Sequence, residues 1–223
     1  MGTCVALFRG INVGSAKRVA MADLKALFES LELIRVRTLL NSGNVLFDAK
    51  RLNPAKLSKA IEKTFEARFG FASNVTLVTA AALDVIVRAN PLLQAVKDPA
   101  RHLVAFPKDP GVLERLRPLT KQSWCPDALA ITEAAAYLWC VKGVLESPLS
   151  QAFAKAAGAK VTARNWTTVL KSRPPPPEAA RAGRPGRRAG GSILPPDAPV
   201  AQLDRVSASE AEGHWFESSR ARQ

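Results

Sequence analysis

The sequence predicts an α+β fold of two ferredoxin-like halves, each with the order β-α-β-β-α-β, followed by a disordered tail. Short apolar runs alternate with helical patterns in residues 1–90, and the same order recurs in residues 101–172. The two stretches are divided near Asn90 to Ala100. From residue 173 to 223 the patterning stops and a run rich in Pro, Arg, Gly and Ala takes its place.

The first half contains six elements in the expected order and one further helix. The segment Asn41-Ser42-Gly43-Asn44 has a turn composition and predicts a hairpin between two short apolar runs. Asn53-Pro54 supplies an N-cap and a first-turn proline for a helix. We expect, in order, a strand at 4–8, a helix along Leu24, Leu27, Phe28 and Leu31, strands at 36–40 and 45–47, a helix along Leu57, Ile61, Phe65 and Phe69, a strand at 75–78 and a short helix at Leu83 to Val87.

The second half repeats this order, so its hairpin around residues 133–135 should be equivalent to the hairpin around Ser42-Gly43. Asn165 is a natural N-cap for the last helix. We expect, in order, a strand at 102–106, a helix at 111–116, strands at 128–132 and 136–140, a helix at 148–157, a strand at 161–163 and a helix at 165–170.

The chain is strongly basic, with 32 Lys and Arg against 19 Asp and Glu and a formal net charge of +13. Most of this excess precedes the tail, although the basic residues are scattered rather than clustered. A positive surface attracts phosphates and polyanions, so the charge is compatible with an anionic ligand, nucleotide or RNA as partner.

The cysteines and the N-terminus indicate a cytoplasmic protein. Cys4, Cys125 and Cys140 are odd in number and form no CxxC pair, and Cys4 and Cys140 lie in apolar runs. We therefore expect buried thiols in a reduced compartment. The chain begins without a signal-peptide pattern, and no apolar stretch reaches the roughly 20 residues that would span a bilayer, so we expect no membrane association.

Three separated motifs resemble the domain-of-unknown-function family 1697. They are Phe8-Arg9-Gly10-Ile11-Asn12-Val13-Gly14, the turn 41–44 with Val45-Leu46-Phe47, and Thr162 to Val169. They occur in the family's order, and the resemblance runs from about residue 3 to 171. It implies an α+β protein of two ferredoxin-like halves, with no established activity. The chain departs from the family at Gly14-Ser15-Ala16-Lys17, where members often carry a second glycine and an earlier lysine.

Topology predicts where a ligand would bind. In a ferredoxin-like unit the end of the first strand and the turn of the hairpin share one end of the sheet, and a glycine-bearing loop that leads into a helix can present N–H groups to an anion. The structural alternative is that Gly10 and Gly43 permit tight turns and Asn12 caps backbone groups. The candidate ligand-binding residues are Arg9, Gly10, Asn12, Lys17, Ser42, Gly43, Asn44, Arg164 and Trp166.

Arg164 and Trp166 have two interpretations. They could bind an anionic, planar ligand through charge and stacking. Alternatively, Trp166 fills the groove between the halves while Arg164 pairs with a carboxylate.

The sequence offers no catalytic constellation, metal site or cofactor motif. His102 is the only histidine before the tail, so a two-histidine metal centre is excluded there. The leading hypothesis is a binding module for a phosphorylated ligand, nucleotide or RNA. One alternative is an enzyme acting on a small phosphorylated or acyl substrate at Arg9, Asn12, Ser42 and Asn44, and another is a protein-interaction platform.

The tail resembles a translated transfer-RNA gene. Permitted codons for Trp215-Phe216-Glu217-Ser218 spell ggttcgaatcc, the T-arm signature. We interpret residues 173–223 as read-through past a lost stop codon. Their composition cannot bury enough apolar surface to offset the entropy of ordering.

Overall fold

A computed structural model gives the fold of the chain and describes residues 1–13, 17–50, 53–109 and 111–174. The tail predicted at 173–223 lies outside the described residues from residue 175 onward. Gly14, in the first family motif, lies outside them as well.

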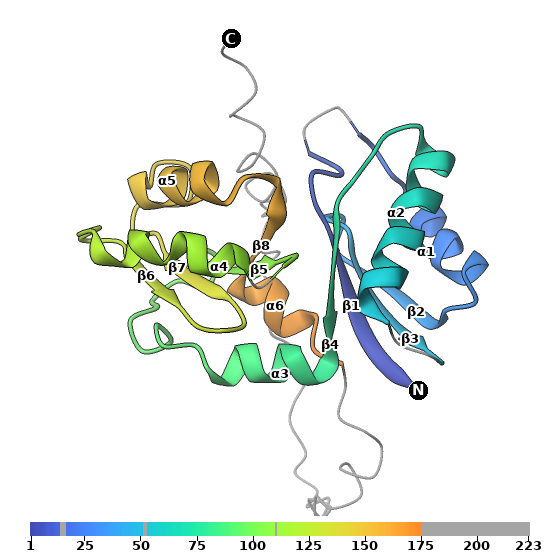
Figure 1. Ribbon diagram of the computed structural model, residues 1–223, viewed down its shortest axis with the longest axis horizontal. Helices are drawn as coiled ribbons and strands as arrows, with labels where there is room; N and C mark the ends of the chain where they lie inside the picture. The colour runs from blue at the N-terminus through green and yellow to red at the C-terminus, as the bar shows by residue number, and fades with distance from the viewer. Residues whose placement is uncertain (14–16, 51–52, 110, 175–223) are drawn as a thin grey trace, which may run out of the picture.

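The first half has the expected β-α-β-β-α-β order and forms one antiparallel sheet with strand order β2-β3-β1-β4 (Figure 1). A short helix, α3, follows the last strand. The elements are β1 (Gly2–Phe8), α1 (Met21–Ser30), β2 (Ile34–Leu39), β3 (Asn44–Ala49), α2 (Pro54–Phe69), β4 (Val75–Thr79) and α3 (Ala80–Arg88).

The second half repeats this arrangement, with strand order β6-β7-β5-β8 and a final short helix α6. A 3₁₀ turn, Arg117–Lys121, is added after α4. The elements are β5 (His102–Pro107), α4 (Gly111–Leu116), β6 (Ala128–Ile131), β7 (Ala136–Trp139), α5 (Pro148–Ala157), β8 (Val161–Asn165) and α6 (Trp166–Lys171). The α+β prediction of two ferredoxin-like halves is confirmed.

Strand β8 is longer than predicted. The sequence pattern ended it at residue 163, because Arg164 and Asn165 interrupt the apolar run. In the structure Arg164 pairs with Val104 of β5 and Asn165 pairs with Leu103, so the strand continues. Both polar residues are buried. Arg164 has side-chain partners far away in sequence, and Asn165 caps the next helix. A periodic pattern of apolar residues does not predict such partners.

Side-chain caps start four of the helices. The Asn53 side chain accepts a hydrogen bond from the amide of Lys56 at the start of α2. Thr79 caps α3 and Asn165 caps α6 in the same way. Each of these caps is the last residue of the last strand in its half, so the helix follows the strand directly. Ser147 caps α5. The repeat therefore extends beyond the six elements to the helix that follows them.

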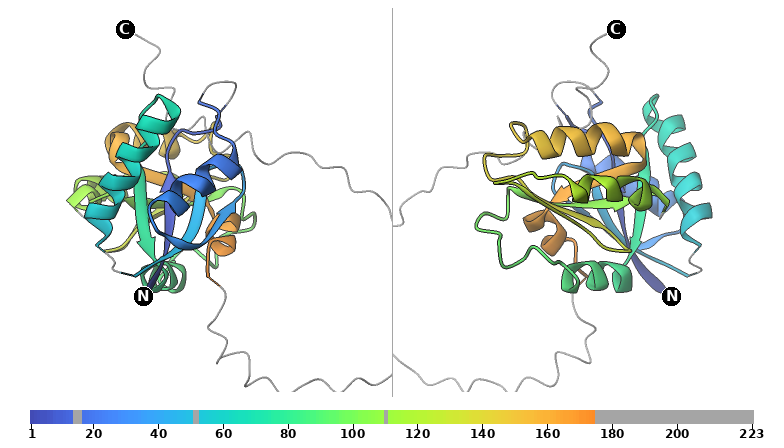
Figure 2. Two further views of the ribbon diagram at one scale, coloured as in Figure 1. Left: turned by 90° about the vertical axis from the view of Figure 1, so that its right-hand side faces the viewer. Right: turned by 60° about the vertical axis from the view of Figure 1, so that its left-hand side comes forward.

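Each sheet is buried on both faces. Helices α1 and α2 cover the outer face of the first sheet, and α4 and α5 cover the outer face of the second (Figures 1 and 2). The inner faces share a third apolar cluster, which joins both sheets with α3 and α6. The Tyr137 hydroxyl of β7 donates to the carbonyl of Ile86 in α3 at 2.7 Å, across the halves.

The strand registers show which residues are equivalent in the two halves. Leu7 of β1 pairs with Thr76, and Phe106 of β5 pairs with Thr162, so the two threonines correspond. Two residues further along these strands, Val78 corresponds to Arg164. The equivalent halves thus differ at an interface position, where one carries an apolar residue and the other a cation.

Within the described residues, no helix is both long enough and apolar enough to cross a bilayer.

Candidate functional site

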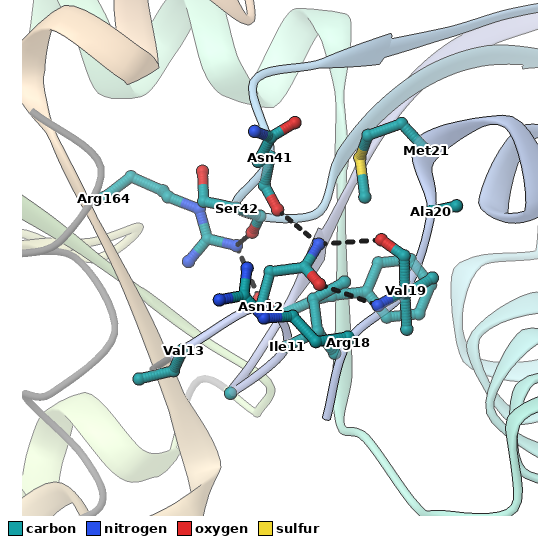
Figure 3. A pocket seen from close by; sticks show the side chains of 12 residues that line it. Ile11, Asn12, Val13, Arg18, Val19, Ala20, Met21, Asn41, Ser42 and Arg164 are labelled. Carbon is teal, nitrogen blue, oxygen red and sulfur yellow. Dashed lines mark hydrogen bonds between the residues drawn. The ribbon is translucent and has the colours of Figure 1, made fainter. Parts of the chain in front are cut away.

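A pocket of about 420 Å³ opens at the strand-exit end of the first half (Figure 3). Its walls come from the β1–α1 loop, the β2–β3 turn and one residue of β8. The lining residues are Phe8, Gly10, Ile11, Asn12, Val13, Arg18, Val19, Ala20, Met21, Asn41, Ser42 and Arg164. The predicted neighbourhood of loop and hairpin turn is therefore present, and the second half contributes to it.

Asn12 holds the pocket loop together. Its amide Nδ2 donates to the carbonyl of Val19 at 2.9 Å and to the carbonyl of Asn41 at 2.8 Å, and its Oδ1 accepts from the amide of Val19 at 2.7 Å (Figure 3). Its backbone has a φ of 56°, in the left-handed region that Asn tolerates best after Gly. One donor hydrogen of the side chain is used within the β1–α1 loop and the other joins this loop to the β2–β3 turn, so Asn12 shapes the wall of the pocket.

Gly43 allows the hairpin turn to lie close to β1. Its φ is 72°, and a Cβ at this position would stand 2.5 Å from Ile11 Cδ1 and 2.9 Å from Phe8 Cβ. Gly10 has a φ of 69° in the facing loop. Both glycines therefore have the turn-permitting role considered above, and of the two only Gly10 lines the pocket.

Arg164 reaches from β8 across the boundary between the halves. Its Nε donates to Asn44 Oδ1 at 2.6 Å, and one terminal nitrogen donates to the carbonyls of Phe8 at 2.5 Å and Ser42 at 3.1 Å. The other donates to the carbonyl of Ala163 at 2.8 Å. These partners are carbonyl and amide oxygens, whereas the sequence predicted a carboxylate. The β8 guanidinium thus binds the end of β1 and the β2–β3 turn together.

Arg18, rather than Lys17, supplies the exposed cation of the pocket. Arg18 lines the pocket, and Figure 3 shows its side chain and that of Arg164 pointing toward the same part of it. Lys17 is exposed and does not line the pocket, and its carbonyl accepts from the amide of Asn12 at 3.0 Å. Arg18 stands three residues before α1 begins at Met21, and no local sequence pattern distinguishes it from Lys17 as the cation that lines the pocket.

The N-terminus of α1 also faces the pocket. Ala20 precedes the helix and Met21 begins it, and both line the pocket. Ala20 makes no side-chain capping hydrogen bond. The first-turn amides therefore add a positive potential on this side, which Asp23 in the first turn reduces.

Besides Lys17, four predicted site residues lie outside the pocket lining. Arg9 is half-buried, its backbone amide donates to the carbonyl of Asn74, and its carbonyl accepts from the hydroxyl of Ser73. Asn44 is fully buried, and its amide donates to Leu39 and Ser42. The remaining two are Gly43 and Trp166.

Trp166 belongs to the apolar cluster between the sheets, as the structural interpretation predicted. Its ring centroid lies 5.4 Å from that of His102. It therefore packs in the interior and does not line the pocket.

His102 is a buried structural residue. Its Nδ1 lies 3.1 Å from the carbonyl of Leu138, so this nitrogen carries the proton. Its Nε2 accepts from the Asn90 amide at 2.8 Å, and Asn90 Oδ1 in turn accepts from the amide of Leu92. Burial lowers the pKa of His102, and the hydrogen bond to Leu138 opposes this shift. Among the described residues, no group of three His, Cys, Asp or Glu side chains could hold a metal ion.

Comparison of the halves shows that the fold does not require the pocket loop. In the first half, residues 9–20 connect the first strand to its helix, whereas residues 108–110 suffice in the second. The sheets are otherwise equivalent, so the first loop is an addition to the common frame. Additions of this kind commonly carry function on a shared scaffold.

Comparison with protein-family models finds a match to "Protein of unknown function (DUF1697)" over residues 1–137. The chain belongs to the DUF1697 family. This confirms the resemblance carried by the motifs of the β1–α1 loop and the β2–β3 turn, both of which contribute to the pocket. Among the curated proteins, none matches the chain.

A solved structure shares the fold of this DUF1697 protein. It is that of the conserved bacterial protein SP0830 from Streptococcus pneumoniae, with 21% sequence identity and a TM-score of 0.61. The alignment covers 77% of this chain and 96% of the bacterial protein. At this identity the likeness concerns the fold alone.

Proposed function

We propose that the protein binds a small phosphorylated ligand in the pocket at the strand-exit end of its first half. One observation carries the proposal. Arg18 and Arg164, from different halves, line this pocket, and none of the described residues that line it is acidic.

Two guanidinium groups that face one cavity repel each other, and a bound dianion converts this repulsion into attraction to both. Guanidinium also matches the geometry of phosphate oxygens, which can accept two parallel hydrogen bonds from it. The positive end of α1 adds to the potential. Because Arg164 is held by four acceptors, it contributes charge from a fixed position, while the exposed Arg18 is able to move onto the ligand.

The arrangement favours a small ligand over an extended RNA strand. Recognition of RNA on a sheet of this topology uses stacking on an open sheet face. Both faces of both sheets are covered here by helices or by the other sheet. A pocket of about 420 Å³ is within the size range of small-molecule sites.

We propose that the pocket binds its ligand and does not catalyse a reaction on it. The described lining contains no His, Cys, Asp, Glu or Lys that could act as a general base. Ser42 is the one hydroxyl there, and its Oγ accepts from Asn44 Nδ2 at 2.9 Å.

Calorimetric titration of the full chain with ribose 5-phosphate tests the proposal. Replacing Arg18 by Ala should weaken binding about tenfold, equivalent to about 1.4 kcal/mol. Arg115→Ala is the matched control, because Arg115 is an exposed arginine on α4 in the other half. The expected result is wild-type affinity for the control. Absence of binding to the wild-type chain, or equal losses in both variants, would contradict a site at this pocket.

A further inference from the structure

We infer that the ligand is a nucleoside monophosphate, whose base is recognised by Asn41 and the adjoining Met21 while its phosphate lies at the arginines. This inference rests on the proposed function and adds to it the chemical class of the ligand.

Asn41 presents an available amide at the pocket. Its backbone is fixed, because its carbonyl accepts from Asn12 Nδ2 at 2.8 Å. Its side chain is exposed and lines the pocket, and within the described residues its amide makes no hydrogen bond. A carboxamide offers one donor and one acceptor side by side, which is the arrangement that pairs with two atoms on the edge of a nucleobase.

The apolar side chain of Met21 lies next to this amide and lines the pocket. The other apolar lining residues labelled near the arginines in Figure 3 are Ile11 and Val13. In Figure 3, Met21 and the Asn41 amide lie on the opposite side of Asn12 from Arg18. The thioether sulfur of methionine makes favourable contacts with aromatic rings. The side of the pocket with Asn41 and Met21 is thus suited to a base, and the side with the two arginines is suited to a phosphate.

The size of the pocket agrees with one nucleotide. About 420 Å³ lies near the lower end of the range for small-ligand sites. The two arginines provide for one phosphoryl group, whereas a cradle of several cations is typical of triphosphate sites.

The test compares ribose 5-phosphate with the 5′-monophosphates of adenosine, guanosine, cytidine and uridine, each titrated calorimetrically into the full chain. At least one nucleotide should bind about tenfold or more tightly than ribose 5-phosphate. Asn41→Ala should remove most of that advantage while leaving the affinity for ribose 5-phosphate unchanged. Asn74→Ala is the matched control, since Asn74 is also exposed and its carbonyl also accepts a hydrogen bond from the β1–α1 loop, at the amide of Arg9.

The outcomes separate the two proposals. If ribose 5-phosphate binds in an Arg18-dependent manner and no nucleotide binds more tightly, the base subsite is wrong and phosphate binding stands. If a nucleotide still binds more tightly than ribose 5-phosphate after Asn41→Ala, the proposed base subsite is also wrong. If neither class of ligand binds, both proposals fail.

Discussion

The hydroxyl of Thr76 lies 3.3 Å from the hydroxyl of Thr162, although 86 residues separate them, and the two threonines occupy equivalent positions of β4 and β8. When equivalent residues of a repeat touch each other, the axis that relates the two copies passes between them. The halves are therefore related by a pseudo-two-fold axis near this pair. Arg164 and its partners stand on one side of this axis, where the structure departs from symmetry.

The Arg164–Asn44 contact should contribute strongly to stability. By register, the equivalent contact on the other side of the axis involves Val78 and Ala135, both in the apolar cluster. Arg164→Val alone should cost about 3 kcal/mol or more, because it leaves Asn44 Oδ1 and neighbouring carbonyls buried without donors. The double variant Asn44→Ala/Arg164→Val, which copies the apolar pair, should lose at least about 1 kcal/mol less than the sum of the single variants. Urea unfolding measures all four free energies, and strict additivity would argue against direct coupling.

His102 should make the fold sensitive to mild acid. Because its pKa is lowered in the folded state, the unfolded chain takes up a proton first, near the ordinary value of about 6.5. The stability from neutral His102 is complete above that pH and is lost as the pH falls below it. Unfolding free energies at pH 7.5 and 5.5 should therefore differ more in the wild-type chain than in His102→Gln. An equal drop in both chains would assign the acid sensitivity to other groups.

The three cysteines should differ in reactivity. Burial raises the pKa of Cys4 and of Cys140 to about 11, and both thiols are fully buried. Cys125 is exposed, in contrast to the general expectation of buried thiols. Iodoacetamide at pH 8 should therefore label Cys125 in the folded chain and all three residues in denaturant, because the thiolate is the reactive form. Mass spectrometry of tryptic peptides provides the measurement, and rapid labelling of Cys4 would contradict its burial.

Much of the fold follows from local patterns that the sequence displays directly. The caps at Asn53 and Asn165, the hairpin turn at residues 41–44 and the apolar faces of α1 and α2 depend on neighbours within a few positions. The order of the elements predicted a ferredoxin-like topology, in which β3 lies beside β1. The β1–α1 loop was therefore correctly expected beside the hairpin turn.

The site was only partly predictable, because its key contacts join distant segments. The family motifs include Arg9 and Asn44, yet neither residue lines the pocket, and Asn44 is fully buried. Whether Lys17 or Arg18 faces the pocket depends on backbone torsions within the loop, and Lys17 has a φ of 53°. No periodicity encodes that choice, so residue type alone could not distinguish the two cations.

The equivalent positions 78 and 164 carry a valine and an arginine, which is possible only because the two halves have different sequences. In a homodimer of identical half-chains, the residue at this position would be the same in both subunits, so a cation would occur twice or be absent. Covalent fusion of the two copies removes that constraint. The first half then carries Val78, which packs in the apolar cluster between the sheets. The second half carries Arg164 at the equivalent position, and this residue lines the pocket of the first half. A single chain thus forms one pocket from residues of two similar halves, which strict two-fold symmetry would not allow.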